Sequence, residues 1–492
     1  MTQTSIDPTA FAPPPLRGDL NALEGFAAPR PGLNERRAEG KSLRQTIPRP
    51  EHAKYRRRKE TASALALLQK QNESRVPSLV PVRMARMAAS PFGYFRGSAA
   101  VMAGDLATSS TTGLEVVACG DMHVMNFGVF ASAERDLVFA INDFDEVHPG
   151  AWEWDLKRLA ASAAVAVAFM GGDKIAAQNA AWETVRSYVK SINRYADKGF
   201  LETWYDLIKE DAILAATAPS RRPMVRKMMD KARSRGPVRA LDTLTTKVDG
   251  EHRIVEDAPL IVHETHLSNG MPIAEALDRV FRSYMASLPL DRRMLLSRYR
   301  MIDVARKVVG VGSVGTGCWV ILFQGLDSGD PLLLQVKEAK ESILAPYSKR
   351  KLPFANQGLR VVTGQRLIQG SPDIFLGWGP DHEESDISHF YIRQLADMKG
   401  GISIVPGDTE MLGVFEGYCR LCGWAAALAH AKSGDPARIA GYCGLSDSLA
   451  EAISKFALAY LEQTERDHAA LTTAIRQGKI AVASPEEAGL TH

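Results

Sequence analysis

Three short polar segments and one lysine carry the side chains that phosphoryl transfer requires. That reaction needs a carboxylate for the attacking hydroxyl, oxygen ligands for Mg²⁺, a backbone cradle for the phosphates and a cation beside them. The first segment places Asp121 five positions before Asn126, directly after an apolar run. The carboxylate can accept the hydroxyl proton while the amide oxygen binds Mg²⁺, a hard cation that prefers oxygen. By itself this pair is a weak signal, because an Asp and an Asn in a loop usually cap a turn.

The second segment follows an apolar strand pattern and holds four acidic or amide side chains in five positions, from Asn142 to Glu146. Asp143 fits a metal ligand whose aromatic neighbour, Phe144, packs into the core, and Asp145 is a further candidate ligand. The alternatives are a plain polar loop or a calcium site. A calcium loop, however, has a longer acidic register with a glycine turn and a late Glu, which this segment lacks. The pattern therefore favours Mg²⁺ ligands at the end of a strand.

The third segment is a G-x-G-x-x-G motif whose backbone could approach phosphates through Gly310, Gly312, Ser313 and Gly315. Dinucleotide-binding folds use the same spacing, but there the glycines lead into a helix. Here the following run, CWVILF, is rich in β-formers and leads through a turn to another strand. That third strand ends at Lys337, where a kinase places its lysine on the α- and β-phosphates. A dinucleotide oxidoreductase is therefore disfavoured.

Taken together, the segments resemble the aminoglycoside and choline kinase-like branch of the protein-kinase superfamily. The resemblance implies ATP and Mg²⁺ as cofactors, Asp121 as the catalytic base and a structural role for His123. It also implies that Asp155, in the run Trp-Asp-Leu, buttresses the catalytic loop rather than reacting. The matching residues are Gly120-Asp121, His123 and Asn126, followed by Asp143-Phe144-Asp145 and Trp154-Asp155-Leu156.

From about Lys41 onward, nearly the whole chain is also similar to a widespread bacterial family of unknown function, number 2252. The runs that carry this resemblance include SPFGYFRG, CGDMHVMNFG, NDFDEVHPGAWEWDLKRLAAS, VVGVGSVGT, LLLQVKEA and AHAKSGD. The family has no settled activity, so the resemblance supports the fold and the motifs rather than a substrate.

Three features depart from the kinase pattern. The catalytic segment near residue 120 precedes the glycine loop near residue 312, which implies a circular permutation. Cys119 stands where a His or Tyr often precedes the catalytic Gly-Asp. The expected helix after the lysine holds no Glu between Lys349 and Gln369, so the acidic partner of the lysine is expected to be Glu338 or Glu341, or to be absent. In a permuted kinase, the helix end at AHAKSGD should also lie near the catalytic loop.

The elements that must position these residues predict an α+β, circularly permuted, protein-kinase-like fold with two lobes and a large helical portion. We expect a small antiparallel sheet with one helix between about residues 305 and 395, with Lys337 facing Asp143. The helices after about Met411 should return to pack beside the strands near Phe127 and Phe139. The predicted division is a disordered tail at 1–40, the first part of the helical catalytic lobe at 41–300, the β-rich nucleotide-binding lobe at 301–400, the remaining catalytic-lobe helices at 401–475 and a tail at 476–492.

The composition limits the classes of protein to which this chain can belong. The 492 residues are 45% hydrophobic and 24% charged, which is ordinary for a globular protein, and a net charge of +3 is too mild to indicate nucleic-acid binding. The longest apolar run, from Leu159 to Gly172, is too short to span a membrane, and no secretory signal opens the sequence. Five cysteines fit a reducing cytoplasm, and Cys419 and Cys422 are expected to pack within a helix.

These observations predict a cytoplasmic, ATP- and Mg²⁺-dependent phosphotransferase acting on a hydroxyl of a small molecule or protein. Nucleotidyl (AMP) transfer on the same fold is one alternative, and a non-catalytic nucleotide-binding pseudokinase or scaffold is another. Release of ADP or of pyrophosphate separates the two reactions. The acceptor and the oligomeric state do not follow from the sequence. Arg83, Arg86 and Arg96 are either surface charges or a clamp for phosphate or substrate.

Overall fold

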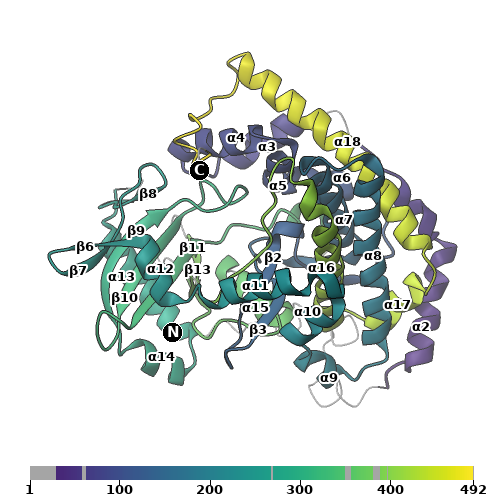
Figure 1. The fold of residues 1–492 in the computed structure, drawn as a ribbon, viewed down its shortest axis with the longest axis horizontal. Helices are drawn as coiled ribbons and strands as arrows, with labels where there is room; N and C mark the ends of the chain where they lie inside the picture. Colours follow the sequence, from purple (N-terminus) through teal and green to yellow (C-terminus); the bar gives the residue numbers. More distant parts are fainter. Residues whose placement is uncertain are drawn as a thin grey trace.

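The computed structural model describes residues 29–57, 63–267, 270–348, 356–380, 388–395 and 397–490. It is a mixed α+β protein, as the sequence predicts, with a β-rich part beside a larger helical part (Figure 1). No helix within the described ranges is long and apolar enough to cross a membrane.

The β-rich part is built on one six-stranded antiparallel sheet, in the order β12-β13-β11-β10-β9-β8. This confirms the predicted antiparallel sheet, which also recruits a short strand, β8, from before residue 300. Between β11 and β12 the described residues include the helix α15 (Gln357–Ile368) and a short 3-10 helix at Ala345–Tyr347. The strands are β8 (Ile261–Val262), β9 (Arg300–Lys307), β10 (Cys318–Gln324), β11 (Pro331–Glu338), β12 (Gly377–Pro380) and β13 (His389–Gln394).

Alternation along β11 gives the sheet two different faces, because successive side chains of a strand point to opposite sides. Leu334 and Val336 pack in the cluster formed with α13 (Ile273–Ser287). Leu333 lies on the other face, with Lys337, and packs against Leu241 of α12 (Pro237–Leu244). One face of the sheet is therefore a helix-covered core, while the other faces α12 and the helical part.

The helical part is centred on α7 (Trp152–Phe169), in which nearly every residue is buried. Its alanine-rich sequence lets neighbouring helices approach closely, which explains the apolar run seen in the sequence. Around α7 pack α8 (Lys174–Ala196), α16 (Leu412–Ser433) and the long α18 (Ser448–Arg476), which runs along the outer edge of the molecule (Figure 1). Two small sheets complete this part, formed by β1 (Glu115–Ala118) with β4 (His148–Ala151), and by β2 (Phe127–Ala131), β3 (Leu137–Ile141) and β5 (Ile208–Lys209).

The carboxy-terminal helix α16 returns to the strands near residue 127, as predicted. The Tyr418 hydroxyl donates to the Val124 and Phe127 carbonyls at 2.8 and 2.9 Å, and its ring packs edge-on against Phe139. The end of α16 then meets the start of β1, where the Val117 N–H donates to Ser433 Oγ at 3.2 Å. Two segments 316 positions apart in the sequence thus adjoin in space beside the catalytic segment.

Both predicted tails contain ordered structure. Residues 1–28 lie outside the described part of the chain, but residues Leu33–Ser42 form α2, which packs on α17 (Pro436–Cys443). This contact needs a glycine, because a Cβ at Gly40 would lie 1.9 Å from the Arg438 carbonyl oxygen. At the other end, Ala488 is fully buried, although the sequence predicts a tail from residue 476. The contact of α2 with α17 was not predicted, because the amino-terminal residues are rich in glycine and proline, which is typical of a disordered tail.

The remaining elements connect these parts. Helices α3 to α6 lie between α2 and β1, and helices α9 to α11 link the helical part to the sheet. Their bounds are α3 (Ala64–Asn72), α4 (Val80–Ala88), α5 (Pro91–Gly97), α6 (Ala99–Leu106), α9 (Phe200–Tyr205), α10 (Glu210–Ala216), α11 (Arg222–Arg233), α14 (Leu290–Leu296), β6 (Thr245–Val248) and β7 (Glu251–Ile254).

Candidate functional site

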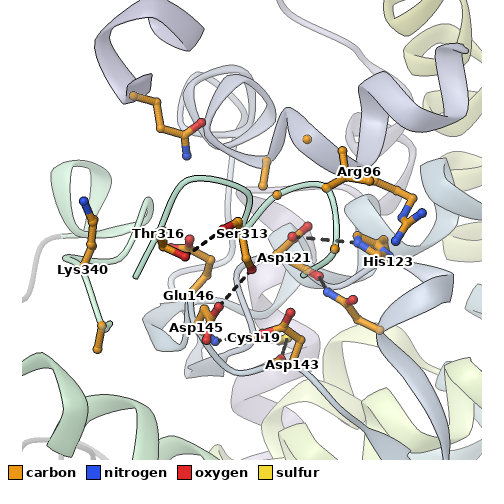
Figure 2. Close-up of a pocket in the computed structure, with 18 of the residues that line it drawn as sticks. Arg96, Cys119, Asp121, His123, Asp143, Asp145, Glu146, Ser313, Thr316 and Lys340 are labelled. Carbon is orange, nitrogen blue, oxygen red and sulfur yellow. Dashed lines mark hydrogen bonds and ion pairs between the residues drawn. The ribbon is translucent and has the colours of Figure 1, made fainter. Parts of the chain in front are cut away.

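The sequence-predicted segments meet around a cavity of about 110 Å³ between the sheet and the helical part (Figure 2). Gly315 does not line it, and Lys337 reaches it through an ion pair with Asp145. The predicted residues on its wall are Asp121, His123, Asn126, Asp143, Asp145, Gly310, Gly312 and Ser313. Segments nearly 200 positions apart therefore contribute to one site.

One carboxylate oxygen of Asp121 is hydrogen-bonded to the protein, and the other faces the cavity. Its Oδ1 accepts hydrogen bonds from Nε and Nη2 of Arg158, on α7, at 2.8 and 2.5 Å. Its Oδ2 lies 3.9 Å from His123 Nε2 and faces Gly312, where a Cβ would stand 3.8 Å away. Asn126 Nδ2 donates to the Asp121 backbone oxygen at 2.9 Å, which turns the Asn126 side-chain oxygen toward other partners. One carboxylate oxygen of Asp121 is thus available to a bound group.

Asp155 fixes the start of this loop from α7. It is 1% exposed, and its two oxygens accept the N–H groups of Cys119 and Gly120 at 2.6 and 3.0 Å. His430, from the run AHAKSGD, lies 3.3 Å from the same carboxylate. Gly120 has a φ of +79°, a conformation that favours glycine, and any Cβ there would strike the backbone of Glu146. The contact expected of Asp155 from the family resemblance is therefore present.

Asp143 is a partly exposed carboxylate with few hydrogen-bond partners among the described residues. Phe144 beside it is 1% exposed and packs in the core, as predicted. Asp143 Oδ1 accepts only the Asp145 N–H, at 3.3 Å. Burial, and then the charge of Asp145, raises the pKa of Asp143. A cation beside Asp143 would relieve this cost.

Asp145 is the acidic partner of Lys337. Its Oδ2 lies 2.5 Å from Lys337 Nζ and accepts the Ser313 hydroxyl at 3.3 Å, and its Oδ1 accepts the Tyr391 hydroxyl at 2.5 Å. Burial alone would raise the pKa of Asp145, but the Lys337 ammonium and its hydrogen bond lower it. The expectation that the partner would be Glu338 or Glu341, or be absent, is corrected, since the partner is Asp145 and Glu338 accepts the Gly317 N–H at 3.0 Å. Both oxygens of Asp145 therefore already have protein partners in this arrangement.

The glycine loop connects β9 to β10 and opens no helix, as the sequence predicts. The connection between α3 and α4, together with α4 itself, holds it in place, which the sequence did not indicate. Gly315 has a φ of +87° and packs against Arg75 rather than lining the cavity. The contacts run from Arg75 Nη1 to the Val314 carbonyl at 2.5 Å, from the Val76 N–H to the Gly315 carbonyl at 2.8 Å and from Arg86 Nη1 to the Gly310 carbonyl at 2.6 Å.

Two further residues at the site were given no individual role by the sequence analysis. Arg360, 1% exposed on α15, donates to the carbonyls of Asp145, Val147 and Lys340. These bonds connect α15 to the loop after β3 and to the residues after β11. Glu146 lines the cavity, and burial raises its pKa to about 7. A buried arginine bonded to carbonyls and a glutamate in an acidic run leave no distinctive sequence pattern.

The oxygen atoms at this site suit Mg²⁺ better than a metal with a full protein cage. Within the described ranges, no three His, Cys, Asp or Glu side chains are grouped to hold one metal ion. Asp143 Oδ2 and Asn126 Oδ1 also have no hydrogen-bond partner among the described residues. Mg²⁺ is usually bound by one or two protein oxygens together with water and phosphate. Asp143 and Asn126 therefore fit such an ion.

Comparison with known proteins identifies one family. A family model described as an uncharacterized protein conserved in bacteria (DUF2252) matches residues 75–474. This range begins at Arg75, which holds the glycine loop, and it includes every residue of the cavity that the sequence predicted. No curated protein and no solved structure matches the chain.

Proposed function

The chain belongs to the DUF2252 family of uncharacterized proteins conserved in bacteria, and we propose that it is an ATP- and Mg²⁺-dependent phosphotransferase. Its acceptor would be a hydroxyl of a small molecule or protein. One observation carries the proposal: Asp121, Asn126 and Asp143 surround the same cavity as the glycine loop and the ion-paired Lys337. Random loops and caps have no reason to bring these residue types together from distant segments.

The order of elements in space supports a circularly permuted kinase-like fold. The strand, glycine loop, strand and lysine strand (β9, β10, β11) are followed by α15, by β12 and β13 and then by α16. The end of α16 adjoins β1, which leads into the catalytic segment. Joining residue 433 to residue 115 would give the kinase order of lobes, because the nucleotide-binding sheet would then precede the catalytic loop.

In this proposal each residue has one role. Asp121 Oδ2 accepts the proton of the attacking hydroxyl, while Arg158 and the loop held by Asp155 fix its position. Asn126 and Asp143 hold Mg²⁺, which would neutralise charge on the phosphates when bound. The backbone of Gly312 and Ser313 covers the phosphates, and Lys337 contacts them from its place beside Asp145.

A nucleotide would require the cleft to open. Pockets that bury a ligand of drug size usually hold about 300–1,000 Å³, whereas this cavity holds about 110 Å³. The sheet face beyond Lys337 is covered by Leu241 of α12, which packs on Val320 and Leu333. We therefore expect α12 to move aside for the nucleoside. Its amide hydrogens should exchange faster with MgATP bound, and unchanged exchange would contradict this movement.

The proposed activity is tested by incubating the protein with γ-labelled ATP, Mg²⁺ and fractions of a bacterial metabolite extract. Transfer of label to an extract component with release of ADP supports the proposal. Release of AMP and pyrophosphate would instead indicate nucleotidyl transfer, and binding of ATP without any turnover would indicate a scaffold. Asp121→Asn is the matched control, because it removes the proton acceptor while keeping the size of the side chain.

A further inference from the structure

The structure distinguishes the three arginines between residues 83 and 96. Arg83 is fully buried and donates to two side chains and a carbonyl nearby. Arg86 donates to carbonyls of the glycine loop and of the carboxy-terminal segment. Arg96 lines the cavity, yet its guanidinium has no hydrogen bond or ion pair with any described residue, and its Nε is buried without a partner. The guanidinium carbon of Arg96 lies 6.0 Å from the centroid of the Phe92 ring.

Arg96 stands where the glycine loop meets the catalytic segment. It lies in the last turn of α5, and a Cβ at Gly312 would be 3.3 Å from the Arg96 carbonyl oxygen and 3.8 Å from Asp121 Oδ2. In Figure 2, Arg96 lies beside His123 and Asp121, at the end of the cavity away from Thr316 and Lys340. Gly312, at the tip of the loop, therefore lies close both to Asp121, the proposed base, and to Arg96.

The positively charged side chains near Gly312 and Asp121 differ in whether they form an ion pair with a carboxylate. Arg158 is paired with Asp121, and Lys337 is paired with Asp145. His123 adds no positive charge near neutral pH, because burial and the two neighbouring arginines hold its pKa well below the ordinary value. A guanidinium stays charged in proteins, and a charge in a desolvated position is costly without a partner. Among the described residues, Arg96 is thus the cation at this end of the cavity that forms no ion pair, although the charge of Asp121 acts on it.

We infer that Arg96 binds the phosphoryl group during its transfer, so that the chain supplies its own arginine to the transition state. The inference rests on the proposed function. In the transfer step the acceptor oxygen forms a bond to the terminal phosphorus, and the bond from that phosphorus to the bridging oxygen breaks. ADP leaves with the electron pair, and the hydroxyl proton passes to Asp121. The guanidinium fork of Arg96 donates to the outer oxygens of the phosphoryl group, on which negative charge is spread.

The position favours the transferred group over a separate anion on the acceptor. A glycine-rich loop covers the phosphates, and the base contacts the attacking hydroxyl, so the phosphoryl group passes between the two. Gly312 and Asp121 mark these two sides, and Arg96 adjoins both. An arginine that stabilises a transferring phosphoryl group raises the rate by roughly 10³–10⁵-fold in other phosphotransferases.

The test measures affinity for MgADP alone and for MgADP with aluminium fluoride, which mimics the phosphoryl group in transfer. Arg96→Ala should leave MgADP affinity within about twofold but weaken the aluminium fluoride complex by roughly 10²-fold or more. Arg96→Lys should recover only part of the loss, because lysine keeps the charge but not the planar fork. Arg476→Ala, an exposed arginine at the end of α18, serves as the control and should match the wild type.

The possible failures are distinguishable. If the wild type does not bind MgADP, the proposed function fails and this inference fails with it. If MgADP binds but Arg96→Ala leaves the fluoride complex unchanged, the inference about Arg96 is wrong while the proposed function stands. A higher KM for the acceptor with an unchanged fluoride complex would also overturn it, since Arg96 would then bind the acceptor. If Arg96→Ala misfolds, its affinity for MgADP will fall as much as its affinity for the aluminium fluoride complex. In that case the same comparison is made with Arg96→Lys, and an unchanged fluoride complex in that variant would overturn the inference.

Discussion

The ion pair between Lys337 and Asp145 should couple the stability of the sheet strongly to that of the loop after β3. Lys337 Nζ lies 2.5 Å from Asp145 Oδ2, and the side chains are 3% and 24% exposed. Removing one partner of a buried pair costs roughly 3–5 kcal/mol, because the other charge is left without compensation. After Lys337→Met, Asp145 keeps the hydroxyl of Tyr391 and stays partly hydrated. We therefore expect a lower cost, of about 2–3 kcal/mol.

The coupling is measured by a double-mutant cycle with Lys337→Met, Asp145→Asn and the double variant. Urea unfolding followed by tryptophan fluorescence and by circular dichroism gives the free energy of unfolding where the two probes coincide. The double variant should be more stable than the sum of the single costs predicts, by about 2 kcal/mol, because no unpaired charge remains. If the single costs add within about 0.5 kcal/mol, the two side chains are not coupled and the arrangement of the cleft described above is wrong.

Three further outcomes follow from the same structure. Asp155→Ala leaves the N–H groups of Cys119 and Gly120 without an acceptor, so the free energy of unfolding in urea should fall by about 2–4 kcal/mol, and a change below about 1 kcal/mol would contradict its role. Asp121→Asn should slow turnover by roughly 10²–10⁴-fold with nucleotide affinity retained, and wild-type turnover would exclude Asp121 as the base. Burial lowers the pKa of His52, bonded to Tyr442, from 6.5 to about 3. Because only the unfolded chain then binds a proton between these values, stability should be present above pH 6.5 and fall by about 2 kcal/mol by pH 5. His52→Gln should flatten this slope in urea unfolding at the two pH values, and an unchanged slope would refute the assignment.

Spacing in the sequence was sufficient to predict the local arrangements of the site. The strand formers after the glycine loop excluded a helix there, and the resemblance to the kinase-like branch implied the contact of Asp155 with the loop of Asp121. Both depend on neighbours within about forty positions, where the chain itself limits the possible geometry. The separation of the catalytic segment from the glycine loop also required the later helices to return to the strands near Phe127, which α16 does.

The partner of Lys337 could not be predicted, because it depends on how distant elements pack. Glu338 is adjacent in sequence and lines the cavity, but it points to the opposite face of the strand from Lys337, and its carboxylate accepts the Gly317 N–H. Asp145 contacts the lysine because the loop after β3 lies against the sheet in the folded protein. Arg75 and Arg360 were missed for a related reason. An arginine in a loop or on a helix gives the same sequence signal whether it faces solvent or donates to a distant backbone carbonyl.

The most direct test of the central claim is a calorimetric titration of ATP, with and without Mg²⁺, into the wild type and into Asp143→Asn. If the cleft is a nucleotide site, the wild type should bind ATP saturably and more tightly with Mg²⁺. Asp143→Asn should lose most of the gain from Mg²⁺, about tenfold or more in affinity, because it removes the charged ligand of the ion. Absence of binding to the wild type, or an equal gain from Mg²⁺ in both proteins, would contradict the account.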